Sequence, residues 1–160
     1  VCDAVNKSVC KQVVYITTGG ALYGKPEYLP CDETHPISPI SPYGLSKWTL
    51  ERYQQLILRN SIRIKTLRLS NVYGKGMSKK NVFYDIVSQI RSNKLKLQLY
   101  NPLAVRDFIS IEDVCDAICK ISNNPNKGIF NICTGVGTSV KRLADLIIKY
   151  SDLNYLLYPK

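Results

Sequence analysis

Two segments decide the fold of this chain: QVVYITTGGALYG at residues 12–24 and SPYGLSK at residues 41–47. The first begins as a continuous apolar run, which is typical of a strand that is buried on both faces of a parallel sheet. The second predicts the start of a helix, because Ser41 is a good N-cap and Pro42 suits the first helical position. A strand, a long loop and a helix in this order predict an α/β fold.

Strands and helices alternate on both sides of these segments. The predicted strands are residues 12–17, 64–69, 95–100, 105–109 and 128–133. The predicted helices are the end of one at residues 1–11, followed by 42–60, 81–93, 111–122 and 139–150. Residues 19–40 are expected to form a long loop rich in Gly and Pro. The pattern predicts a mainly parallel sheet with helices on both faces, which binds ligands in loops at the carboxyl ends of its strands.

Composition excludes some classes of protein. The 160 residues carry a net charge of +10, but the Lys and Arg residues are spread along the chain, so nucleic-acid binding is not expected. One short cluster, Lys75, Lys79 and Lys80, is either a solvated surface or a local field that attracts a diphosphate. No run of about 18 apolar residues occurs, so neither a transmembrane helix nor a membrane partner is expected.

The cysteines and the single histidine do not suggest a metal site. Six cysteines are scattered without the two-residue spacing of a zinc knuckle, and Cys115 and Cys119 lie four apart in a predicted helix. We therefore expect buried, reduced thiols in a cytoplasmic protein rather than three disulfides in a secreted one. His35 precedes Pro36 in the Pro-rich loop, where a surface position is expected rather than a metal ligand.

Tyr43 and Lys47 lie four residues apart, so they share one face of the predicted helix. Free tyrosine ionises near pH 10, whereas a general base works best when it ionises near the working pH. An adjacent ammonium stabilises a phenolate, and the helix N-terminus adds a smaller favourable effect. Such a pair can serve in proton transfer; the alternative is an exposed Tyr and Lys on a surface helix.

The residues around this pair resemble a known active-site segment. A strand ending in Thr17 and Thr18 is followed by small residues, by Tyr23, by a Pro-rich acidic loop and by SPYGLSK. This order is similar to that of the extended short-chain dehydrogenases/reductases, in particular the NAD-dependent epimerase/dehydratase family with its UDP-glucose (UDP-galactose) 4-epimerases. The resemblance covers roughly residues 1–150. It implies the C-terminal part of a Rossmann-like parallel sheet with helices on both faces, plus part of a smaller substrate-binding domain.

The resemblance also implies roles for residues near the strand ends. Tyr43 would exchange a proton with the sugar hydroxyl that is oxidised, and Lys47 would hydrogen-bond the nicotinamide ribose of NAD. Thr18 is the expected hydroxyl between the sugar and Tyr43, because the family's more common position for it holds a glycine here. Thr17 is the alternative candidate for this hydroxyl. Thr17 and Leu69 are also assigned to the cofactor site. Alternation along a strand lets only one of the two threonines face the site.

The resemblance assigns four further residues to the nucleotide-sugar: Asn71, Asn81, Tyr100 and Arg106. Asn71 and Tyr100 each have an ordinary alternative, as a turn residue and as an edge-strand aromatic. Asn81 begins a predicted helix, whose free N–H groups suit a phosphate. Arg106, in the motif Arg-Asp-Phe-Ile, would grip the diphosphate with its planar fork, unless it pairs only with Asp107 or Asp113.

The resemblance divides the chain into two parts. Residues 1–76 correspond to the second half of an NAD-binding Rossmann-like domain with the Tyr/Lys pair. Residues 77–160 correspond to a nucleotide-sugar-binding part that partly returns to the sheet. The sequence has no G-x-x-G-x-x-G segment and begins within a predicted helix without Met, so we expect a C-terminal fragment that lacks the pyrophosphate cradle.

The expected function is NAD-dependent epimerisation of a nucleotide sugar, such as a UDP-hexose, by transient oxidation at C4. Gly19, Gly20 and Ala21 stand where dehydratases carry an Asp-Glu pair, which favours an epimerase over a 4,6-dehydratase or decarboxylase. The sequence is also compatible with a reductase of the same family and with a truncated, non-catalytic binding protein. The resemblance further implies a cytoplasmic homodimer as the full-length protein, with a place in lipopolysaccharide or capsule sugar synthesis.

Overall fold

The structure, a computed structural model, describes residues 1–92, 96–151 and 156–159. The chain forms two compact units. The first contains Val1–Ser70 and Glu112–Cys133, and the second contains Asn71–Ile111 and Thr134–Lys160. The first unit includes residues 128–132, which pair with its strand at residues 63–69.

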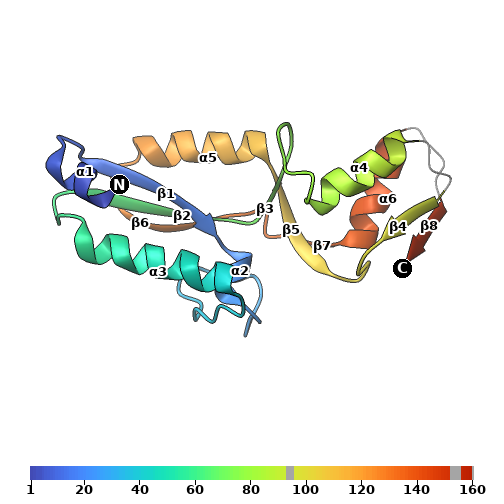
Figure 1. The fold of residues 1–160 in the computed structure, drawn as a ribbon, viewed down its shortest axis with the longest axis horizontal. Coiled ribbons are helices and arrows are strands. Elements are labelled where there is room, and N and C mark those ends of the chain that lie inside the picture. Colours follow the sequence, from blue (N-terminus) through green and yellow to red (C-terminus); the bar gives the residue numbers. More distant parts are fainter. Residues whose placement is uncertain (93–95, 152–155, 160) are drawn as a thin grey trace. The chain divides into compact units, whose positions relative to one another are not determined.

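The first unit is a parallel sheet with a helix on each face (Figure 1). Its strands are β1 (Gln12–Thr18), β2 (Arg63–Leu69) and β6 (Gly128–Ile132), in the order β1-β2-β6. Its helices are α1 (Cys2–Lys7), α2 (Gly20–Tyr23), α3 (Pro42–Ile57) and α5 (Ile111–Asn123). In Figure 1, α3 and α5 lie on opposite sides of the three strands. This arrangement confirms the predicted α/β class.

Alternate residues of β2 distinguish the two faces of this sheet. Arg68 faces α3, where it pairs with Glu51, whereas Lys65 faces α5. The Lys65 ammonium donates hydrogen bonds to the carbonyl oxygens of Ile121, at 2.5 Å, and Asn124. These carbonyls lie in the last turn of α5 and directly after it, where the helix has no partners of its own for them. The same contacts therefore satisfy the buried ammonium and the helix end.

The helix α3 begins as the sequence predicts. The Ser41 hydroxyl accepts a hydrogen bond from the N–H of Gly44 at 3.1 Å, and Pro42 occupies the first turn. The helix ends at Ile57 rather than at residue 60. A Cβ atom on Gly44 would lie 2.2 Å from the carbonyl oxygen of Ala21, so glycine is what allows α2 to lie this close to α3.

The second unit is built from short strands and two amphipathic helices. Its strands are β3 (Asn71–Tyr73), β4 (Lys96–Leu99), β5 (Val105–Ser110), β7 (Gly137–Ser139) and β8 (Leu156–Pro159). Its helices are α4 (Val82–Arg91) and α6 (Val140–Tyr150), capped by Asn81 and Ser139. β5 pairs in parallel with β3 and antiparallel with β7, and β4 pairs in parallel with β8. The buried core residues are Ile86, Ile90, Leu97, Leu99, Val140, Leu143 and Ala144.

Three short elements differ from the prediction. α2 lies in the predicted loop 19–40, β3 lies between the predicted strand 64–69 and the predicted helix 81–93, and β7 lies at the start of the predicted helix 139–150 and just before it. Each spans three or four residues, too few to show a periodic pattern, and β3 and β7 form because β5 offers them hydrogen-bonding partners. Residues 93 and 95, at the ends of two predicted elements, lie outside the described residues.

No disulfide joins any of the six cysteines, all of which lie in the described part of the chain. Cys115, Cys119 and Cys133 are exposed, so the predicted burial is wrong for these three. Cys115 and Cys119 lie on a different side of α5 from Val114, which packs into the interior. Within the described ranges, no helix has the length and hydropathy required to cross a bilayer.

Candidate active site

The carboxyl ends of the first unit's three strands lie level with one another. Thr18 pairs with Leu69, and Leu69 pairs with Ile132, in adjacent parallel strands. Parallel α/β sheets bind ligands at this end, because the connecting loops leave the strands there. The Leu69 carbonyl oxygen accepts a hydrogen bond from the N–H of Gly19 at 2.8 Å, which holds the turn after β1 against the end of β2.

The structure brings Tyr43 and Lys47 together at the start of α3. The Lys47 Nζ atom lies 5.7 Å from the centroid of the Tyr43 ring, within cation–π range. Tyr43 is 57% exposed and Lys47 is partly exposed, so both side chains are accessible to a ligand. An ammonium at this distance interacts favourably with a phenolate. The pair can therefore exchange a proton with a hydroxyl group bound at the strand ends.

Thr17 and Thr18 face opposite sides of β1, as strand alternation requires. Thr17 lies beside Arg68 in the sheet and so faces α3. It is 5% exposed, and its hydroxyl has no hydrogen-bond partner among the described residues. Thr18 lies beside Leu69 and is partly exposed. Thr17 is therefore on the face of the sheet that carries α3 and Tyr43, whereas Thr18 is on the opposite face and is partly exposed at the end of the strand.

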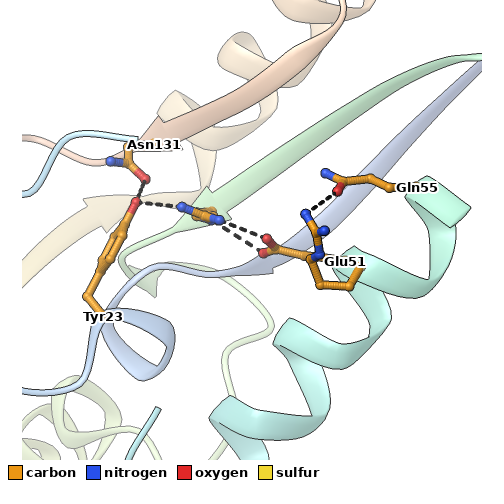
Figure 2. Close-up of polar contacts among 6 residues, drawn as sticks. Tyr23, Glu51, Gln55 and Asn131 are labelled. Atoms are coloured by element: carbon orange, nitrogen blue, oxygen red, sulfur yellow. Dashed lines mark hydrogen bonds and ion pairs between the residues drawn. The ribbon is translucent and has the colours of Figure 1, made fainter. Parts of the chain in front are cut away.

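A buried polar network, which the sequence did not predict, lies two helical turns along α3 from Tyr43 (Figure 2). Arg68 of β2 forms an ion pair with Glu51 of α3, with Nη2 2.9 Å from Oε2. The Arg68 Nη1 atom donates to the hydroxyl of Tyr23 at 3.0 Å, and that hydroxyl donates to Oδ1 of Asn131 at 2.7 Å. The signal in the sequence is an arginine within a strand that is otherwise mostly apolar near its carboxyl end.

The loop between α2 and α3 is organised around His35, and the expectation that this residue lies on the surface is wrong. His35 is 3% exposed and contacts the rings of Tyr23 and Tyr28, at centroid distances of 5.2 and 4.5 Å. Its Nε2 accepts a hydrogen bond from the N–H of Glu27 at 3.0 Å. The proton is therefore on Nδ1, which donates to the carbonyl of Pro36 at 2.8 Å. A Pro-rich stretch predicts a loop, but the aromatic pair that encloses this loop's histidine is a tertiary feature.

The residues assigned to the nucleotide-sugar lie on separate elements of the second unit. Asn71, in β3, donates from Nδ2 to the carbonyl oxygen of Asp107 at 3.3 Å. Asn81 caps α4: its Oδ1 accepts from the N–H of Phe83 at 2.8 Å, and its Nδ2 donates to the carbonyl of Val72 at 3.0 Å. Both polar atoms of the Asn81 amide are thus used within the fold. A phosphate at this place would meet backbone N–H groups of the first helical turn instead.

Arg106 and Tyr100 are exposed in the second unit. The Arg106 Nη1 atom donates to the carbonyl oxygen of Val105 at 2.7 Å. Tyr100 follows β4 and is 70% exposed. The neighbouring Asp107 accepts, through Oδ1, a hydrogen bond from the N–H of Thr134 at 3.0 Å, so this carboxylate stabilises the fold. In the described ranges, no group of three or more His, Cys, Asp or Glu residues is arranged to hold a metal ion.

Fold and site together define a class of protein: an α/β domain in which a helix beginning with a Tyr–Lys pair follows a parallel strand that ends in hydroxyl side chains. The chain belongs to the NAD dependent epimerase/dehydratase family, whose model matches residues 1–133. This match confirms the predicted resemblance.

The relatives are named for different activities. A Methanocaldococcus jannaschii protein named "Putative UDP-glucose 4-epimerase" is 39% identical over 149 residues, covering 91% of this chain and 48% of that protein. An Escherichia coli dTDP-4-dehydro-6-deoxyglucose reductase is 31% identical over 144 residues, covering 86% of this chain and 45% of that protein.

A solved structure shows the same fold. The crystal structure of UDP-glucose 4-epimerase from Thermotoga maritima, with UDP-glucose, matches with a TM-score of 0.85 at 28% identity, covering 99% of this chain and 53% of that one. The likeness confirms the predicted Rossmann-like arrangement of sheet and helices. The chain spans about half the length of the relatives it matches.

Proposed function

We propose that the complete protein containing this chain is an NAD-dependent nucleotide-sugar 4-epimerase. The observation that carries the proposal is the accessible Tyr43–Lys47 pair at the carboxyl ends of parallel strands, in a member of the epimerase/dehydratase family. The relatives from Methanocaldococcus and Thermotoga, by their names, support a UDP-hexose as the substrate. Gly19, Gly20 and Ala21 offer no carboxylate for the elimination of water, which supports an epimerase over a dehydratase.

Each residue of the first-unit site has a role in this proposal. Tyr43 takes the proton from the C4 hydroxyl of the sugar and later returns it. Lys47 stabilises the phenolate by its charge and donates a hydrogen bond to the cofactor ribose. Thr18, which is partly exposed at the end of β1, is assigned the hydroxyl that orients the C4 hydroxyl towards Tyr43, and Thr17 and Leu69 are assigned to contact the cofactor. A bound NAD+ would supply the hydride acceptor and donor for reversible oxidation at C4.

The chemistry of the first unit suits the nicotinamide half of NAD. A partly exposed ammonium lies beside an exposed phenol, and together they offer the donors and the acceptor that a ribose diol requires. The 160 residues contain no G-x-x-G-x-x-G segment for a pyrophosphate, so the adenosine half would be held by residues outside this chain.

The second unit is proposed to bind the nucleotide end of the substrate. Arg106 would donate two parallel hydrogen bonds to the diphosphate, for which a planar guanidinium is suited. Tyr100 would stack on the base, and its high exposure leaves the ring accessible. Asn71 and the backbone at the start of α4, next to Asn81, would complete the set of donors.

The product of the reaction tests the proposed reaction type. The complete protein is incubated with UDP-glucose and NAD+, and the products are analysed by mass spectrometry and NMR. An epimerase returns a sugar of unchanged mass without net consumption of the cofactor. A dehydratase product is about 18 mass units lighter because one water is lost, and a reductase consumes reduced cofactor in step with product. Either of these two results would overturn the assignment.

The proposed proton transfer is tested by Tyr43→Phe. We expect kcat to fall at least about a hundredfold, the usual scale for loss of a general acid–base group. Nucleotide-sugar binding changes little, because the aromatic ring remains. Tyr53→Phe is the matched control, since Tyr53 is another exposed tyrosine of α3. Equal loss of activity in both variants would indicate a structural effect on the helix.

We further propose that the complete protein is a homodimer in the cytoplasm. Leu45 and Leu56 of α3 are 52% and 77% exposed, and a second copy would bury them. Sedimentation velocity measures the state directly, and Leu56→Glu is expected to shift it towards the monomer. A monomeric wild type at micromolar concentration would reject the dimer. Cysteines without disulfides suit the reducing cytoplasm.

A further inference from the structure

We propose that Arg68 is a positioning residue, which ties α3 and α2 together and thereby sets where Tyr43 and Lys47 stand at the strand ends. The inference rests on the proposed function, because that function names Tyr43 and Lys47 as the groups that require positioning. Arg68 lies one residue before the end of β2 and is 4% exposed. Its guanidinium contacts both Tyr23 and Glu51, which are labelled in Figure 2.

Arg68 contacts α3 through Glu51. The Arg68 Nη2 atom lies 2.9 Å from Oε2 of Glu51, and Nε lies 3.4 Å from Oε1, so the two planar groups meet with two contacts. Glu51 is spaced four residues from Lys47 and eight from Tyr43, and these spacings place all three on one side of the helix. The pairing therefore fixes both the rotation of α3 and its position along β2.

Arg68 contacts α2 through Tyr23. Besides the hydrogen bond from Nη1 to the Tyr23 hydroxyl, the Arg68 guanidinium lies 5.3 Å from the centre of the Tyr23 ring. The same hydroxyl donates to Asn131 of β6, which anchors α2 to the sheet. α2 in turn lies against the first turn of α3, where the Ala21 carbonyl leaves no space for a side chain on Gly44. Gly44 directly follows Tyr43, so this contact locates the proposed base.

A charged pair at this place contributes a defined geometry rather than extra stability. Burying two charges removes them from water, and well-packed apolar side chains of similar volume are often equally stable. Apolar contacts, however, allow a helix to slide and rotate, whereas a two-contact guanidinium–carboxylate pair has a defined geometry. We therefore expect the Arg68–Glu51 pair to matter more for turnover than for stability.

The experiment compares variants of the complete protein. The double variant Glu51→Leu with Arg68→Met removes both charges together, so no unpaired buried charge is left to unfold the protein. Tyr23→Phe removes only the Tyr23 hydroxyl, and with it the hydrogen bond from Arg68. It keeps the ring that His35 and Arg68 contact. Arg52→Lys is the control, because Arg52 is an exposed residue of the same helix and donates to Gln55 at 3.0 Å.

Three quantities are measured: kcat, KM and the amide hydrogen exchange of residues 41–47. In the double variant we expect kcat to fall about tenfold or more, because a small displacement of reacting groups is costly, while KM stays within about twofold. Exchange of residues 41–47 becomes faster, and the melting temperature stays close to that of the wild type. Tyr23→Phe shows the same pattern with a smaller loss, and Arg52→Lys matches the wild type.

A double variant that keeps wild-type kcat and wild-type exchange would overturn the positioning role. A loss of kcat in proportion to a loss of melting temperature, with no change confined to residues 41–47, would also overturn it. The exchange measurement does not depend on the reaction. If the wild type lacks epimerase activity, the proposed function fails, and exchange in the double variant still decides whether Arg68 holds the start of α3.

Discussion

The two threonines that end β1 are neighbours in the sequence but differ in what their hydroxyl groups can do. Thr17 is buried on the α3 face, and its hydroxyl has no partner among the described residues. Thr18 is partly exposed at the carboxyl end of the strand. A buried hydroxyl without a partner reduces stability, whereas an accessible one can bind a ligand. A substitution by valine separates these two roles, because it removes the hydroxyl and keeps the branched shape.

For Thr18→Val we expect a clear loss of kcat in the complete enzyme, smaller than that of Tyr43→Phe, because a bridging hydroxyl is lost while the base remains. For Thr17→Val we expect little change in kcat and an unfolding free energy that is unchanged or higher by up to about 1 kcal/mol, since a desolvated hydroxyl is removed. Steady-state kinetics and denaturant unfolding measure the two effects. A larger loss of kcat in Thr17→Val would show that Thr17 carries the catalytic hydroxyl instead.

Arg106 allows a second test at the level of one side chain. Arg106→Lys keeps the positive charge and loses the planar fork. We expect nucleotide-sugar binding by the complete enzyme to weaken about tenfold, the equivalent of one charge-assisted hydrogen bond, with NAD binding unchanged. Isothermal titration with each ligand provides the comparison. An equal loss for both ligands would assign Arg106 a structural role.

The close contact between α2 and α3 depends on Gly44, which has no side chain. Gly44→Ala normally favours a helix, but here the new Cβ atom would meet the Ala21 carbonyl at 2.2 Å. We expect the unfolding free energy of the complete protein to fall by about 1–3 kcal/mol, the usual cost of overpacking, and kcat to fall with the displaced Tyr43. Gly20→Ala is the matched control for stability, because nothing lies within 4 Å of its added Cβ atom. Equal stability of the two variants would contradict the close approach.

Most elements were predictable from the sequence because their signals are local. The start of α3 follows from a capping hydroxyl and a proline, and the amphipathic spacing of α4 and α6 follows from the helical repeat. α2, β3 and β7 were not predictable, because β-pairing or packing with distant residues decides them. The end of α3 at Ile57 also lacks a local signal, since neither Gly nor Pro follows it.

At the scale of the whole molecule, we propose that the chain contributes only the nicotinamide side of the cofactor site. Its Tyr–Lys pair suits the nicotinamide end of NAD, and its sequence contains no G-x-x-G-x-x-G segment of the kind that holds a pyrophosphate. We therefore expect the isolated 160-residue chain to bind NAD with a dissociation constant above the micromolar range. This holds even when circular dichroism shows that the chain is folded. Calorimetry measures the affinity, with the complete protein as the positive control. Micromolar binding by the folded chain would place the pyrophosphate site within these residues.

The sequence by itself determined the alternating order of strands and helices, the polar loops at the strand ends and the nearness of Tyr43 to Lys47. These features depend on residues close in the chain, and a helical turn brings positions four apart together whatever surrounds them. Only the tertiary structure decided that Tyr23, Glu51, Arg68 and Asn131 meet in one buried network, and that His35 lies inside its loop. The physical reason is the parallel register: it sets Thr17, Arg68 and Asn131 side by side on the face that α3 covers, and no local pattern encodes that register.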